Sequence, residues 1–193
     1  FRRVLFRSTE KAAGFDAIAF GCPAMGVEVL EAVGQTILNL SPITSYSRAY
    51  YIVLSFFVVA AVEEGTKLFF LYRRSWNDPN FDYRFDGIVY STFVSLGFAA
   101  FENIKYVFNY ALTVAFPRAF LAIPGHLGFA VVMGYFYGRA RIAENYGNHA
   151  WAKRNIFMGY LCAVLMHGFY DSCAMIGNGI STILFVVFII CMY

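Results

Sequence analysis

Two adjacent glutamates stand inside an apolar stretch of the chain. Glu63 and Glu64 lie within residues 49–72, a run long enough to cross a bilayer as a helix. A charged side chain at the centre of a membrane costs about 3 kcal/mol or more, so such residues usually have a function. Lys67 lies four and three residues further on, and we expect it to pair with one carboxylate while the other faces the bundle interior. An ion pair that only holds helices together is the alternative, but two glutamates exceed what one lysine neutralises.

Three further apolar stretches carry ionisable residues at similar depth. Glu102 lies more than two helical turns inside the second stretch, beside the amide of Asn103, and His126 lies in the third. The fourth contributes His167 and Asp171, whose i,i+4 spacing puts both on one helix face. The carboxylate can therefore orient the imidazole, or join it around one ion or water. Counted along ideal helices, the whole set falls in the middle third of the bilayer.

Carboxylates and imidazoles gathered from neighbouring helices can activate water. One carboxylate accepts a proton from the water, while imidazoles or a metal ion stabilise the developing oxyanion. The sequence has no GxSxG, HExxH, Ser/Lys pair or phosphate-binding glycine loop. The residues therefore predict hydrolysis by carboxylate-activated water.

The composition identifies a membrane protein. Hydrophobic residues make up 60% of the 193 positions and charged residues only 14%, whereas soluble domains are about 45–50% apolar. We predict an all-α, polytopic transmembrane helix bundle with about five to six spans. The net charge of +3 is small and indicates no nucleic-acid partner.

The apolar runs set the expected spans and their orientation. We expect spans over residues 49–72, 87–110, 118–141 and 156–176 and one from about 180, with a span or interfacial helix over 15–40. The polar segment 142–155 is expected to separate two of them. The two loops on one side are the richer in basic residues: Arg73, Arg74, Arg84, Arg139, Arg141, Lys153 and Arg154. The positive-inside rule places these loops in the cytoplasm. Gly134 and Gly138 form a GxxxG pattern that predicts a close helix contact.

The first eight residues are set apart from the rest of the chain. Residues 1–8 correspond to the translated end of a common sequencing adapter. We therefore interpret them as an assembly scar. Residues 9–193 are then one transmembrane domain. We expect both ends to be truncated, because the chain starts without Met and stops inside an apolar run.

Taken in order, four motifs resemble those of the PrsW family of intramembrane proteases. The segment Glu63-Glu64-Gly-Thr-Lys67 resembles its EExxK motif. The blocks that begin at Asp86 and end at Glu102-Asn103 resemble its DGxxY and FxxxEN patterns. Two further blocks also match: Pro124-Gly-His126 with Gly134–Gly138, and His167-Gly-Phe-Tyr-Asp171. The resemblance covers about residues 15–176.

This resemblance implies an activity and a set of roles. The wider group includes the CAAX prenyl endopeptidases and bacteriocin-processing or self-immunity membrane proteins. It implies a hydrolase of the bacterial inner membrane that cleaves a single-span membrane protein, in some members an anti-sigma factor. By position, Glu63 is the favoured general base, with Glu64 beside it. Glu102 stands where the prenyl endopeptidases have a histidine, and Asp171 where they often have an asparagine.

Metal and metal-free mechanisms both remain open for such a site. Carboxylate and imidazole ligands suit zinc, and if a divalent metal is bound we expect Glu102, His126 and His167 to hold it. Lys67 would tune the glutamate pair, and Asn103 would support Glu102. Two other classes of protein also accommodate intramembrane acids: a cation-coupled transporter, and a non-catalytic binding or immunity protein of the same fold. The transporter predicts repeat symmetry, which the sequence lacks.

Overall fold

The computed structural model describes residues 48–110 and 112–193, and within these ranges helices joined by short loops form the structure, with no strand. The α-helices are α3 (Arg48–Val53), α4 (Ala61–Ser75), α5 (Arg84–Tyr110), α6 (Ala115–Asn145), α7 (His149–Ile176) and α8 (Gly179–Met192). A π-helix, η1 (Leu54–Ala60), and a 3-10 helix, η2 (Leu112–Val114), complete the set. The predicted all-α bundle is confirmed. The interpretations of residues 1–8 and 15–40 concern positions outside the described residues.

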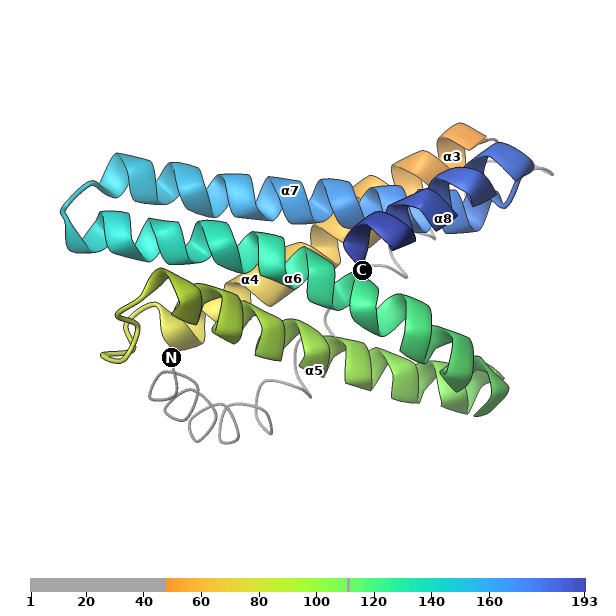
Figure 1. Ribbon diagram of the computed structural model, residues 1–193, viewed down its shortest axis with the longest axis horizontal. Helices are drawn as coiled ribbons and strands as arrows, with labels where there is room; N and C mark the ends of the chain where they lie inside the picture. Colours follow the sequence, from red (N-terminus) through yellow and green to blue (C-terminus); the bar gives the residue numbers. More distant parts are fainter. Residues whose placement is uncertain (1–47, 111) are drawn as a thin grey trace.

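Three helices, α5, α6 and α7, are each long and apolar enough to cross a membrane. They lie side by side and antiparallel, with α6 in the middle (Figure 1). The predicted first span corresponds to α3, η1 and α4, which follow one another without a loop from residue 48 to 75. The predicted fifth span corresponds to α8, a shorter apolar helix. Many large apolar side chains, among them Phe57, Phe120 and Ile183, are exposed, as expected of a surface that faces lipid.

The polar segment 142–155 contains the turn between α6 and α7, as predicted, but most of its residues are helical. Helix α6 continues to Asn145 and α7 begins at His149, so only three residues connect them. Gly147 adopts a φ of 74°, and the Asn148 side chain accepts a hydrogen bond from the Trp151 amide and caps α7. The connection is shorter than the polar segment because hydropathy indicates where a bilayer ends, whereas a helix ends where its caps and turn residues lie.

Close backbone contact joins α5 to α6, as the GxxxG pattern predicts. A Cβ atom at Gly134 would lie 2.6 Å from both the Gly87 carbonyl oxygen and the Ile88 Cα. A Cβ atom at Gly138 would come still closer to the backbone of Arg84. At the start of α5, Asp86 accepts hydrogen bonds from the Asp82 and Tyr83 amides, which ties the first turn of α5 to the loop before it.

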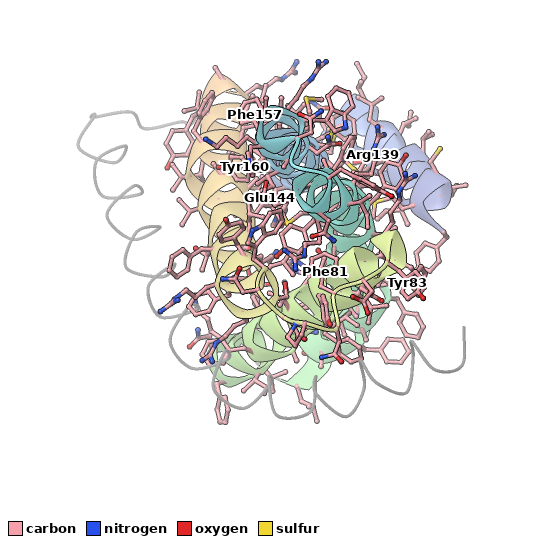
Figure 2. The ribbon with its side chains drawn as sticks, turned by 90° about the vertical axis from the view of Figure 1, so that its left-hand side faces the viewer. Phe81, Tyr83, Arg139, Glu144, Phe157 and Tyr160 are labelled. Carbon is pink, nitrogen blue, oxygen red and sulfur yellow. The ribbon has the colours of Figure 1, made fainter. Side chains whose placement is uncertain are left out.

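The packed core lies toward the basic-loop end of the bundle. Loop 76–83 and the α6–α7 turn are both at this end (Figure 1). Buried Trp76 and Phe81 pack against Tyr137, whose hydroxyl hydrogen bonds with Ser75 at 2.9 Å. Figure 2 views this end, where Phe81 points inward and Tyr83 outward. This aromatic core holds α4, α5 and α6 together below the site described next.

We expect Gly134→Ala to destabilise the bundle by about 1–3 kcal/mol, because the added methyl group meets backbone atoms that cannot move without separating α5 from α6. Thermal unfolding in detergent measures the effect. Gly179→Ala is the matched control, since nothing lies within 4 Å of a Cβ at that position. Equal melting temperatures for the two variants would contradict the packing described above.

Candidate active site

Helix α4 presents the glutamate pair immediately after the π-helical turn η1. Two contacts with α7 fix this part of the chain. The Tyr160 hydroxyl donates to the Ala61 carbonyl oxygen at 3.0 Å, and the Phe56 ring packs directly on the backbone of Gly168. A π-helical turn inside a helix shifts the direction of the side chains that follow, and such turns are frequent at functional sites. Here it directs Glu63 and Glu64 toward the bundle interior.

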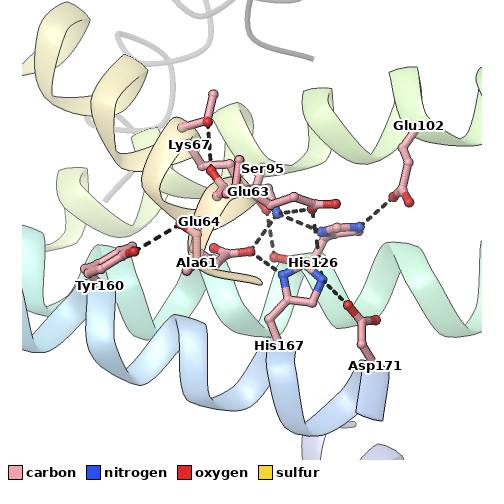
Figure 3. A network of polar contacts seen from close by, with 12 residues as sticks. Ala61, Glu63, Glu64, Lys67, Ser95, Glu102, His126, Tyr160, His167 and Asp171 are labelled. Carbon is pink, nitrogen blue, oxygen red and sulfur yellow. Dashed lines mark hydrogen bonds and ion pairs between the residues drawn. The ribbon is translucent and has the colours of Figure 1, made fainter. Parts of the chain in front are cut away.

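Lys67 contacts both glutamates, not one as predicted. Its Nζ lies 2.7 Å from Glu64 Oε1, 3.3 Å from Glu63 Oε2 and 3.0 Å from His126 Nδ1 (Figure 3). All four side chains are buried. A lysine at i+3 from one glutamate and i+4 from the other reaches both, because the two positions lie on adjacent sides of the helix. The ammonium is thus the centre of the cluster.

His126 enters this cluster from α6. Pro124, inside the same helix, leaves the carbonyl of Phe120 without its helical partner, and the Tyr193 hydroxyl donates to it. The backbone carbonyl of His126 accepts a hydrogen bond from Ser95 at 2.9 Å. Because the Lys67 ammonium can only donate, Nδ1 of His126 accepts, and the ring proton is then on Nε2, which faces Glu102 Oε2 at 3.0 Å. The Nδ1 lone pair therefore points into the cluster.

His167 lies opposite, on α7, with a carboxylate at each ring nitrogen. Its Nδ1 is 2.8 Å from Glu64 Oε1, and its Nε2 is 3.3 Å from Asp171 Oδ2 and 4.0 Å from Glu63 Oε2. The predicted i,i+4 relation between His167 and Asp171 is therefore present in the structure. The ring stacks on Phe129, with centroids 4.9 Å apart, which fixes its plane.

Glu102 stands at the edge of the cluster, between His126 and a cation. Its Oε2 pairs with Arg118 Nη2 at 2.9 Å as well as with His126. Asn103 contacts Arg118 instead of Glu102: its Oδ1 accepts from Arg118 Nε at 2.6 Å. The guanidinium also lies over the Tyr106 ring, 3.7 Å from the centroid. Asn103 therefore supports Glu102 indirectly, through Arg118.

A cavity of about 740 Å³ reaches the cluster from the end of the bundle opposite the basic loops. Its wall includes five of the predicted site residues: Glu63, Glu102, His126, His167 and Asp171. Aromatic side chains such as Phe98 and Tyr170 supply much of the remaining wall. Glu64 and Lys67 lie behind this wall. Of the two adjacent glutamates, Glu63 is therefore the one that a molecule in the cavity can reach.

The donor atoms of the cluster fit a divalent metal ion. Glu63, Glu64, His126 and His167 each offer one ligand atom, and these atoms lie within 4.8 Å of one another. Oε2 of Glu64 is buried without a hydrogen-bond partner among the described residues, so this oxygen has lone pairs available to bind a metal ion. Two carboxylates with two imidazoles are a donor set that suits zinc. Glu102, expected to be a ligand, lies outside this group and contacts Nε2 of His126, the ring nitrogen that points away from Lys67.

The chain belongs to the PrsW family of intramembrane metalloproteases, because the model of this family matches residues 12–193. Among curated relatives it is 35% identical to Protease PrsW of Clostridioides difficile over 161 residues, which are 81% of this chain and 66% of the relative. It is 37% identical to Protease PrsW of Oceanobacillus iheyensis over 117 residues and 36% identical to that of Bacillus subtilis over 118 residues. Each of these two matches covers 61% of this chain and 52% of the relative.

The chain thus spans between about half and two thirds of the length of the curated relatives it matches. No solved structure matches it.

Two contributors to the site were not predicted from the sequence. Arg118 is simply the first residue of an expected span, although a glutamate in an apolar helix such as Glu102 needs a cation nearby, and that need could have pointed to Arg118. Phe129, which stacks on His167, gave no signal, since an aromatic residue in an apolar helix is ordinary.

We expect Arg118→Met to destabilise the protein by about 1–3 kcal/mol, because it leaves the partly buried Glu102 carboxylate with one partner fewer. Thermal unfolding in detergent measures the loss. Arg139→Met on the same helix is the matched control, because Arg139 pairs with no carboxylate among the described residues and contacts only exposed groups, the Tyr135 hydroxyl and the Tyr135 and Trp151 rings. A loss of equal size in both variants would argue against a specific role for the Arg118–Glu102 pair.

Proposed function

We propose that this protein hydrolyses a peptide bond of a membrane protein, with water activated by Glu63. One observation carries the proposal: Glu63 faces the cavity beside His126 and His167, while Lys67, itself paired with Glu64, holds it from behind. A general base must reach the water that attacks the substrate, and only the member of the glutamate pair that lines the cavity can do so. Membership of a family of intramembrane metalloproteases supports the same reaction.

The surrounding residues then have separate roles. Glu63 accepts a proton from water and can return it to the leaving amine. His126 and His167 face the position of the attacked carbonyl, and Glu102 and Asp171 orient these two imidazoles through their Nε2 atoms. Burial of Glu63, His126 and His167 strengthens their interactions by limiting the access of water to them.

Three side chains are proposed to hold a divalent metal ion such as zinc: Glu64, His126 and His167. This choice leaves Glu63 to act as the base, and it uses the carboxylate whose second oxygen has no partner. A bound zinc ion would polarise the scissile carbonyl and make a water molecule more acidic. Glu102 orients His126 in this assignment instead of binding the ion.

The proposed substrate is a single-span membrane protein of the bacterial inner membrane, which an anti-sigma factor would satisfy. This proposal is supported by helices α5, α6 and α7, which carry much of the site and are long and apolar enough to cross a membrane, and by the cavity, which reaches the end of the bundle opposite the basic loops. With those loops in the cytoplasm, the substrate would meet the site from the outer half of the bilayer. Residues 9–193 are proposed to act as one transmembrane domain.

We expect Glu63→Gln to lower the rate of peptide cleavage by about 10²–10⁴-fold, because glutamine cannot accept the proton from water. The protein and the variant are reconstituted with a panel of single-span membrane peptides, and the products are identified by mass spectrometry. Glu144→Gln is the matched control, since Glu144 lies at the far end of α6 and pairs with the exposed His149. Unchanged cleavage by Glu63→Gln would rule out this base.

We expect a strong chelator to abolish cleavage and added zinc to restore it. The reason is that the proposed metal ligands, Glu64, His126 and His167, form the centre of the proposed active site. The same reconstituted assay measures both steps, with the metal content determined before and after treatment. Full cleavage by protein shown to contain no metal would exclude the metal and leave the glutamate-only reaction.

A further inference from the structure

We propose that the Lys67 ammonium occupies the metal position in the metal-free protein, and that a divalent ion must displace it in order to bind. The inference rests on the metal group proposed above, and it is independent of whether any peptide is cleaved. It assigns Lys67 a role as an internal cation that keeps the ligands assembled until the metal arrives.

The contacts of Lys67 are those of a central cation. An ammonium has three N–H donors, and three acceptors surround this one at 2.7, 3.0 and 3.3 Å: Glu64 Oε1, His126 Nδ1 and Glu63 Oε2. Three of the four residues of the candidate metal group are therefore bound to one nitrogen. The fourth, His167, contacts the same Oε1 atom of Glu64 that Lys67 does.

The ammonium and a metal ion cannot share this position. Zinc bonds to nitrogen and oxygen ligands at about 2.0–2.2 Å, so an ion held by Glu64 and His126 would lie between the atoms that Lys67 Nζ now contacts. Nδ1 of His126 has a single lone pair, which serves either the ammonium or the metal. Two positive charges in contact inside a membrane also repel strongly. Each cation therefore excludes the other.

The structure offers the displaced ammonium a second position. Lys67 Nζ already lies 4.6 Å from the centroid of the Phe98 ring, whose face attracts cations. Phe98 and the carboxylate of Glu102 both line the cavity. The flexible four-carbon side chain of Lys67 can swing past the ring toward that carboxylate without unfolding the helix.

The test compares two variants, Lys67→Met and Lys105→Met. Lys105 lines the cavity but lies outside the metal group, so its variant is the control. Zinc affinity is measured by equilibrium dialysis against a competing chelator, and thermal stability is measured without metal and with saturating zinc. We expect Lys67→Met to bind zinc about 5- to 100-fold more tightly than the parent. Its melting temperature should fall by several degrees without metal and recover with zinc, while Lys105→Met should match the parent in affinity.

Equal or weaker zinc binding by Lys67→Met would overturn the inference, because Lys67 would then help to build the site instead of competing for it. If neither parent nor variant binds zinc, the metal proposal fails together with this one. If Lys67→Met does not accumulate, Lys67→Gln, which keeps a donor but no charge, is purified in zinc. Failure of both variants to fold even with zinc present would also contradict the proposal, since zinc would replace the missing charge.

Discussion

The burial of two adjacent carboxylates is the constraint on which the rest of this structure depends. Glu63 and Glu64 are almost entirely buried, so solvent compensates little of their charge. Lys67 supplies the compensating charge from the same helix, and histidines from α6 and α7 complete the contacts. Three helices are therefore tied together at one point by polar atoms. The site is for this reason a part of the fold as well as a place for chemistry.

The residues of the site could be predicted because each violates the chemistry of its surroundings. An acid or a histidine in an apolar run is expensive, so Glu102, His126 and His167 stand out without any structure. Helical periodicity also predicted correctly that His167 and Asp171 would meet, since that relation is local. The order of the four motifs led to the family, which the match over residues 12–193 confirms.

Relations between helices could not be predicted in the same way. The double contact of Lys67 was missed because helical spacing alone permits either glutamate as its partner. The hydrogen bond between Asn103 and Arg118 depends on how α5 packs against α6, and the spacing of residues in the sequence gives no information on that packing. The end of α6 was misplaced because its last turns are polar yet still helical. In each case the missing information was long-range packing or local capping, which hydropathy does not record.

The bundle is packed toward one end and hollow toward the other. Residues around Tyr137 fill the packed part, while Phe98, Tyr170 and their neighbours line the hollow part. Substitutions at lining positions outside the packed core, such as Leu121 and Thr182, change the shape that a substrate meets without removing the contacts of that core. At such positions the scaffold can acquire new substrate preferences while its stability is retained, so an engineer could alter selectivity there first.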